Sequence, residues 1–173
     1  LQRPLGILLM NKLTHNNAPI TGERMSDYQV LHQTQDEYGP LIVLEDKETR
    51  ILAFGENDEQ SKLLKATPHI PQHTYVQAML LVLLYSQPKS AIVLGLGGGG
   101  LIHALRHFDA GIKLTAVELR ADVIELAKRY FQLPLSKKLK VVHQDAKQFL
   151  EAADHKKVDV VFADIYSAEG VDA

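Results

Sequence analysis

Cysteine is missing altogether from these 173 residues. Its absence excludes a disulfide framework, thiolate catalysis and any cysteine-ligated zinc site. Long hydrophobic runs are missing too, because the longest, 78–85, is far shorter than the ~20 residues that cross a bilayer. The first residues show no basic stretch followed by an apolar segment and a cleavage site. We therefore expect no membrane association and no signal peptide, and the cytoplasm is the default compartment.

An excess of charge of one sign is also lacking. Lysine and arginine number 19 against 21 aspartates and glutamates, so the formal net charge is −2. Proteins that hold nucleic acid need a dense basic face, and this balance argues against a nucleic-acid partner. With 46% hydrophobic and 23% charged residues, the composition is typical of an ordinary globular protein and not of a disordered or coiled-coil one.

The first third of the chain has the texture of a small antiparallel β domain, with an expected range of 1–56. Short β-type runs alternate with polar turns there. The region 57–90 is predicted to be a linker and an apolar helix, with the linker-like part at 57–71 and the helix at about 72–87, before Pro88. The block 79–84 in this helix is expected to lie in the core or on an oligomer face, which leaves a homodimer open. The β-type runs are 7–10, 28–31, 41–44 and 50–54.

Beyond Pro88 short apolar strands alternate with helical segments. Such alternation predicts βαβ units and a doubly wound, mostly parallel α/β sheet, here a Rossmann-like ligand-binding domain over 91–173. The predicted strands are 91–94, 113–117, 139–143 and 158–163, and the predicted helices are 101–108, 122–131 and 146–153. The first helix is expected to bury Leu101, Ile102, Leu105 and Phe108 on one face.

A glycine-rich turn follows the first of these strands. Gly95-Leu96-Gly97-Gly98-Gly99-Gly100 satisfies G-x-G-x-x-G between a strand and a helix, where glycine permits positive φ and close approach of a ligand to the backbone. Glu118 ends the next strand, about 20 residues on, where a carboxylate can accept hydrogen bonds from ribose hydroxyls. The structural alternative is a simple glycine turn with a solvated acid.

Two further aspartates end the following strands. Asp145 precedes a helix, where it and the neighbouring Ala146 N–H could read an adenine ring, or where Asp145 could serve only as the helix N-cap. Asp164 ends the next strand, and carboxylates at the carboxyl ends of parallel strands converge on one crevice. Asp159, near the start of that strand, is expected to be structural. A nicotinamide site shares the glycine turn and Glu118, but Asp145 favours an S-adenosyl ligand.

Histidines occur four residues apart at His69 and His73 and again at His103 and His107. Such spacing can place two imidazoles on one helical face, but the sequence has no His-Glu-x-x-His pattern. His103 and His107 are expected on the outer face of an amphipathic helix. We therefore expect no metal site.

These motifs together resemble the spermidine synthase (aminopropyltransferase) family, and especially its divergent branch with a Gly-Leu-Gly-Gly-Gly turn. The resemblance runs from about residue 26 to 170. It implies a methyltransferase-type Rossmann sheet, whose later strands this sequence lacks, so the chain is expected to be a fragment. It is carried by Tyr28-Gln29, Tyr75, Gly95–Gly99, Val117-Glu118, Gln144–Ala146 and Phe162–Tyr166.

The resemblance implies roles for individual residues. Gln29, the glycines 95, 97, 98 and 99, Glu118, Asp145 and Ala146 would hold the nucleoside of decarboxylated S-adenosylmethionine or S-adenosylmethionine, as a co-substrate that is not tightly bound. Tyr75 would line the pocket of a small-molecule amine, Asp164 would accept the proton, and Tyr166 completes the catalytic candidates. The implied reaction is aminopropyl or methyl transfer, as in polyamine biosynthesis.

Three departures from the family pattern concern groups that handle amines or the ligand. Gly100 stands where the family has an aspartate, Ser167 replaces the second acid after the fourth strand, and Val76 replaces the residue after the pocket tyrosine. A pocket two negative charges poorer should bind a dicationic diamine less well, so we expect low specificity for putrescine. Besides transfer, two functions stay open: a nucleoside-binding module without catalysis, and an NAD-dependent oxidoreductase.

Overall fold

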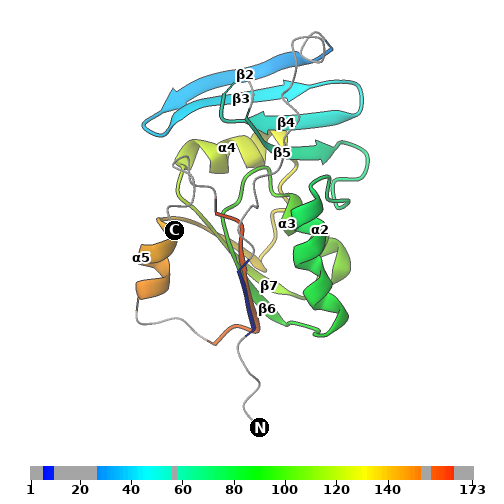
Figure 1. The fold of residues 1–173 in the computed structure, drawn as a ribbon, viewed down its shortest axis with the longest axis vertical. Coiled ribbons are helices and arrows are strands. Elements are labelled where there is room, and N and C mark those ends of the chain that lie inside the picture. Colours follow the sequence, from blue (N-terminus) through cyan, green and yellow to red (C-terminus); the bar gives the residue numbers. More distant parts are fainter. Residues whose placement is uncertain (1–5, 10–26, 56–57, 153–156, 166–173) are drawn as a thin grey trace.

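The computed structural model describes residues 6–9, 27–55, 58–152 and 157–165. These residues form two sheets with helices packed between and around them (Figure 1). The α/β class and the doubly wound parallel sheet predicted from the sequence are confirmed. No helix among the described residues is both long and apolar enough to cross a membrane.

The larger sheet has five parallel strands in the order β1-β9-β6-β7-β8. Its strands are β1 (Gly6–Leu9), β6 (Ser90–Leu94), β7 (Lys113–Glu118), β8 (Leu139–His143) and β9 (Val160–Ala163). The strands alternate with α3 (Gly100–Phe108), α4 (Ala121–Tyr130) and α5 (Ala146–Glu151). The strand order reverses between β6 and β9, and in such sheets ligands bind at this switch point, outside the carboxyl ends of the strands.

The smaller sheet is antiparallel, with its strands in sequence order. They are β2 (Gln29–Asp36), β3 (Gly39–Glu45), β4 (Thr49–Ala53) and β5 (Glu59–Leu64). Figure 1 shows this sheet as a separate layer above the parallel one, with α4 beneath it. Buried residues of β3, β4 and β5 pack against Val123, Leu126 and Phe131, so the two sheets share a hydrophobic layer.

Two predictions for the first part of the chain are wrong. The sequence pattern places the run 7–10 in the antiparallel unit, but β1 pairs in parallel with β9, from Gly6 opposite Val160 to Leu9 opposite Ala163. The stretch 57–71, predicted to be linker-like, contributes β5 as the fourth strand of the small sheet. Its polar composition does not prevent pairing, because Gln60 and Leu63 are buried while other residues of β5 are only partly covered.

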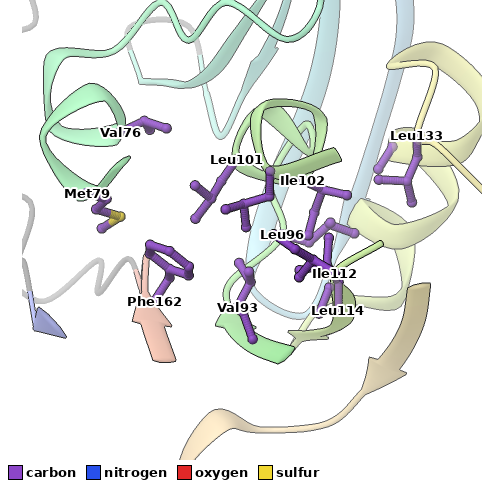
Figure 2. Close-up of a cluster of buried hydrophobic side chains, with 14 of the residues drawn as sticks. Val76, Met79, Val93, Leu96, Leu101, Ile102, Ile112, Leu114, Leu133 and Phe162 are labelled. Atoms are coloured by element: carbon purple, nitrogen blue, oxygen red, sulfur yellow. The ribbon is translucent and has the colours of Figure 1, made fainter. Parts of the chain in front are cut away.

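The main core lies on one face of the parallel sheet. Figure 2 shows Val76 and Met79 of α2 (Thr74–Leu80) with Phe162 of β9, next to Leu101 and Ile102 of α3. The opposite face carries a smaller cluster, with Ile92 and Leu94 against Phe149 of α5. Helices therefore cover both faces, as the doubly wound topology requires.

Some predicted burial differs from the structure. His103, expected on the outer face of its helix, is 7% exposed, because α3 is enclosed on more than one side. Phe108, expected in the core, is half exposed in the last turn of α3. The predicted helix at 72–87 ends earlier, as α2 followed by the 3₁₀ helix Leu81–Leu84. In the block 79–84, Met79 belongs to the core, whereas Leu81 and Leu84 are exposed.

Candidate active site

A cavity of about 130 Å³ opens at the carboxyl ends of β6, β7 and β9, below the small sheet. It gathers seven residues that the sequence singled out, from five separate parts of the chain: Tyr75, Gly95, Gly97, Glu118, Asp145, Ala146 and Asp164. The remaining lining residues are Phe54, Gln60, Ser61, Val117, Leu119, Arg120, Gln144 and Ile165. Because the lining is mostly apolar with a few convergent carboxylates, it suits an amphiphilic ligand such as a nucleoside.

The glycine turn forms the floor of this cavity. Gly95 has φ +86° and its N–H donates to the Val117 carbonyl at 2.8 Å, which joins the turn to the end of β7. A Cβ on Gly95 would overlap the backbone oxygen of Asp164. Glycine is therefore required here both for backbone conformation and for the close approach of β9. Gly99, with φ +78°, is the N-cap of α3.

Gly98 and Gly99 face the protein and not the cavity. The Gly98 N–H donates to Ser61 Oγ of β5 at 2.8 Å, and a Cβ on Gly98 would crowd the Phe131 ring. A Cβ on Gly99 would crowd Leu133. The turn is thus held from outside by the small sheet, while Gly95 and Gly97 line the cavity.

Glu118 is a buried carboxylate, 8% exposed, at the end of β7. Its Oε2 accepts from the Leu96 N–H at 2.9 Å, and its Oε1 accepts from the Arg120 N–H at 3.0 Å. Each carboxylate oxygen can accept about two hydrogen bonds, so the two backbone donors leave capacity for hydroxyl donors of a ligand. The backbone bonds fix the carboxylate plane against the glycine turn.

Asp145 caps α5, since its Oδ1 accepts from the Gln148 N–H at 2.9 Å. This confirms the capping role considered from the sequence. Asp145 also lines the cavity, together with its neighbours Gln144 and Ala146. Its role toward a ligand stays a prediction.

Tyr75 and Asp164 meet at the other end of the cavity. The Tyr75 hydroxyl donates to Asp164 Oδ2 at 3.3 Å, across 89 positions of sequence. Burial raises the pKa of Tyr75 well above its ordinary value, and the negative charge of Asp164 acts in the same direction. The phenol therefore stays protonated and remains a hydrogen-bond donor.

A narrow recess of about 20 Å³ adjoins the cavity and shares Ser61, Tyr75 and Asp164 with it. This volume accommodates about one water-sized group, such as an amino group. Its other lining residues are Lys62, Pro71, Gln72, His73, Val76, Leu96, Gly100 and Leu101. Asp164 is the one carboxylate that lines the recess within the described residues, and no atom lies within 4 Å of a Cβ built on Gly100.

Some candidates lie elsewhere. Gln29 is exposed at the start of β2, paired with Glu45, and does not line the cavity. Tyr166 and Ser167 lie outside the described residues. Asp159 accepts from the Lys89 N–H at 2.8 Å and the Ser90 N–H at 2.9 Å, which bears out its structural role at the start of β6.

The histidines do not pair as their spacing suggests. His69 stacks on His107, with ring centroids 3.8 Å apart, and the His103 Nε2–H donates to the Phe131 carbonyl at 2.8 Å. Across the described ranges, no three histidine, cysteine or acidic side chains cluster as metal ligands would.

Five lining residues carry no sequence signal that predicts them: Phe54, Gln60, Ser61, Leu119 and Arg120. The first three belong to or flank strands of the small sheet, and no local pattern connects them to the glycine turn. Arg120 could have been noticed two residues after Glu118, but a single arginine after a strand carries no specific signal.

Comparisons with known proteins identify relatives of this chain. The spermine/spermidine synthase domain model matches residues 68–172. The polyamine aminopropyltransferase of Vibrio vulnificus is 26% identical over 147 residues, covering 81% of this chain and 49% of that protein. An eEF1A lysine and N-terminal methyltransferase homolog of Drosophila melanogaster is 35% identical over 83 residues, covering 47% of this chain and 12% of that protein.

Solved structures share the fold. A probable spermidine synthase from Corynebacterium glutamicum superposes with a TM-score of 0.67 at 16% identity, covering 81% of this chain and 53% of that one. A spermidine synthase in complex with the transition state analogue AdoDATO gives a TM-score of 0.62 at 17% identity, covering 80% and 47%.

The chain spans about half the length of the curated aminopropyltransferases of Vibrio vulnificus and Neisseria meningitidis that it matches. The family model, in contrast, covers well over half of this chain, including the glycine turn, Glu118, Asp145 and Asp164. Since the model and the fold agree, the chain belongs to the spermine/spermidine synthase domain family, among aminopropyl and methyl transferases.

Proposed function

We propose that this protein transfers an aminopropyl or methyl group from decarboxylated S-adenosylmethionine or S-adenosylmethionine to a small amine. The observation that carries the proposal is the position of Asp164. Asp164 lines both the larger cavity and the adjoining recess, and its carboxylate accepts a hydrogen bond from the Tyr75 hydroxyl. A group there can contact a co-substrate on one side and an amine on the other.

The larger cavity suits the nucleoside part of the co-substrate. The carboxylate of Glu118, fixed by two backbone N–H groups, would accept hydrogen bonds from the ribose hydroxyls. Asp145 and Ala146 would contact the adenine at the opposite wall. The related spermidine synthase in complex with AdoDATO supports an S-adenosyl type of co-substrate for this fold.

The reaction needs little beyond positioning and a proton acceptor. The nitrogen lone pair of the amine forms a C–N bond to the carbon next to the sulfonium, the C–S bond breaks, and a neutral thioether leaves. No oxyanion develops, so orientation provides most of the rate enhancement. An alkylamine with a pKa near ~10 arrives protonated, and Asp164 would take the proton that must leave nitrogen before attack.

The recess favours acceptors other than a diamine. A single carboxylate lines it among the described residues, and Gly100 offers no side chain where an acidic residue would fit. A second ammonium group would therefore find no lining carboxylate there, and we expect low activity with putrescine.

A nucleoside-binding module without catalysis is the second candidate. It is favoured by the same scarcity of acids in the recess, because a protein that only binds the nucleoside needs no amine pocket. The cavity residues around Glu118 would serve either function.

Binding and turnover together test the proposal. Calorimetry with decarboxylated S-adenosylmethionine, S-adenosylmethionine, methylthioadenosine and NADH should show binding of an S-adenosyl compound, whereas preferential binding of NADH would contradict it. Turnover with the tightest donor and a panel of amines should fall by about a hundredfold or more in Asp164→Asn, while donor affinity is retained.

Gly100→Asp is the matched gain-of-charge variant, since its side chain meets open space. It should raise kcat/KM for putrescine relative to a monoamine such as butylamine. Transfer to putrescine by the unmodified protein at the rate of its best acceptor would contradict the specificity part of the proposal. Binding without any turnover would favour the module.

A further inference from the structure

We propose that the tip of the β2–β3 hairpin roofs the adenine side of the co-substrate cavity, and that Arg120 is the positioning residue that holds it there. The tip comprises Asp36–Gly39, in the small sheet. This inference rests on the proposed binding of an S-adenosyl co-substrate. It adds to that site a part of the molecule that the sequence motifs do not reach.

Arg120 connects the two sheets through both its backbone and its side chain. Its N–H donates to Glu118 Oε1 at 3.0 Å, so its backbone helps to fix the ribose-binding carboxylate. Its guanidinium donates to Asp36 through Nε at 2.9 Å and Nη2 at 2.7 Å, and Nη2 also donates to the Gly39 carbonyl at 2.8 Å. One residue therefore orients the carboxylate below the ligand and the hairpin tip above it.

In this ion pair Arg120 is buried and Asp36 is partly buried, which makes its geometry specific. Arg120 is 6% exposed, and its Cζ lies 4.4 Å from the centroid of the Phe54 ring, which lines the cavity. A buried charge pair is tolerated only when its hydrogen bonds are well satisfied, and the planar two-pronged fork of arginine provides this where lysine cannot. The hairpin tip is thus held in one place relative to the cavity.

Tyr38 lies at the tip, half exposed, with its ring centroid 5.9 Å from the Arg120 Cζ. Desolvation raises the pKa of the Tyr38 phenol, and the charges of Glu37, Asp36 and Asp145 act in the same direction. Arg120 lines the cavity, so the Tyr38 ring lies beside one of the lining residues. An aromatic ring placed there can cover the face of a bound purine.

A tryptophan at the tip provides a direct test, because the chain contains no tryptophan of its own. Tyr38→Trp creates a single tryptophan at a half-exposed site, where folding should be unaffected. Titration with methylthioadenosine should change its emission, with a midpoint that matches the dissociation constant from calorimetry. Emission that stays constant at saturating ligand would contradict the proposal that the hairpin tip covers the bound nucleoside.

Arg120→Lys and Asp36→Asn test the positioning role. Each should weaken methylthioadenosine binding by about tenfold or more, and the emission of Trp at position 38 should respond less even at saturation. Glu125→Gln is the control, because it removes an exposed pair with Lys128 on α4 and should leave both readouts unchanged. Circular dichroism checks that each variant is folded.

The outcomes separate this inference from the proposed function. If the unmodified protein does not bind methylthioadenosine, both fall together. If it binds, and Arg120→Lys keeps full affinity and the full emission change, only the positioning role is wrong. A merely structural arginine would lower thermal stability without altering the emission response at saturation.

Discussion

The two sheets contribute to the candidate site in different ways. The parallel sheet supplies residues at the ends of its strands, such as Glu118 at the end of β7 and Asp164 after β9. The antiparallel sheet supplies two lining residues, Ser61 of β5 and Phe54 after β4, and it supplies Asp36, the last residue of β2, as the partner of Arg120. The strand order of the parallel sheet brings its groups together at one edge. The groups of the antiparallel sheet reach the cavity because that sheet packs against the helices of the parallel one.

This difference shows how the small sheet can matter for a ligand that the large sheet binds. The Gly98 N–H is bonded to Ser61, and Arg120 is bonded to Asp36, so two contacts between the sheets lie directly against the cavity. Loosening the contact between sheets should therefore weaken the nucleoside site even where its own residues are intact.

The largest effect on the free energy of unfolding is expected from a pair of glycine substitutions, one at the end of a parallel strand and one in the antiparallel sheet. Gly95→Ala combines a strained φ with overlap of the new Cβ and the Asp164 oxygen, and should cost roughly 4 kcal/mol of unfolding free energy. Gly39→Ala in the hairpin has φ +114° but meets no atom within 4 Å, so only strain of about 1 to 2 kcal/mol applies. Urea unfolding measures both. Equal losses of unfolding free energy in the two variants would show that the overlap with the Asp164 oxygen adds no cost at Gly95.

A second test breaks a contact between the sheets. Ser61→Ala leaves the buried Gly98 N–H without its Oγ acceptor, and should lower the unfolding free energy by about 1 to 3 kcal/mol. Methylthioadenosine affinity should fall as well, because the glycine turn is no longer held. Ser136→Ala removes a similar bond to the Lys138 N–H on an exposed turn and should cost less than about 0.5 kcal/mol. Unchanged ligand affinity in Ser61→Ala would show that this contact with the small sheet is not needed for nucleoside binding.

The smallest effect concerns the pH dependence that His103 of α3 contributes to stability. Burial lowers the pKa of His103 below its ordinary value of 6.5, and the charge of His69 acts in the same direction. At pH values between the lowered pKa of His103 in the folded protein and its ordinary pKa in the unfolded chain, the unfolded chain binds more protons than the folded one. The free energy of unfolding therefore rises with pH in this range. Unfolding free energy should therefore decrease as pH falls below about 6.5, by up to about 1.4 kcal/mol per pH unit.

His103→Gln is the variant that checks this dependence. Its amide can still donate to the Phe131 carbonyl, which accepts from His103 at 2.8 Å, but it does not titrate. Thermal unfolding from pH 7.5 to 5.0 should show a flatter dependence than in the unmodified protein. An identical slope would assign the pH dependence to other groups.

Much of the parallel sheet could be predicted because its signals are local. Apolar runs of strand length alternate with helical segments after Pro88, and three of the four predicted strands lie within a residue of β6, β7 and β8. The structure brings Glu118, Asp145 and Asp164 to one cavity, as expected for the carboxyl ends of parallel strands.

The predictions are wrong where the pairing or burial of a segment depends on which distant part of the chain packs against it. The partner of β1 lies more than 150 positions away, so its short apolar run could not reveal which sheet it joins. His103 was expected outside because α3 was treated as covered on one side, whereas the segment that contains Phe131 encloses it. The polar stretch around Ser61 carried no apolar period that would mark a strand.

The sequence by itself determined the doubly wound topology, the glycine turn and the three carboxylates at strand ends, because periodicity and glycine conformation act over a few neighbouring residues. Only the tertiary structure decided that Ser61 holds the turn, that Arg120 joins Glu118 to Asp36, and that Tyr75 reaches Asp164. These contacts join positions 37 to 89 residues apart, and for the pair of Arg120 and Asp36 the separation is 84. They exist because two sheets bury one hydrophobic layer between them, and no local pattern specifies how two such faces dock.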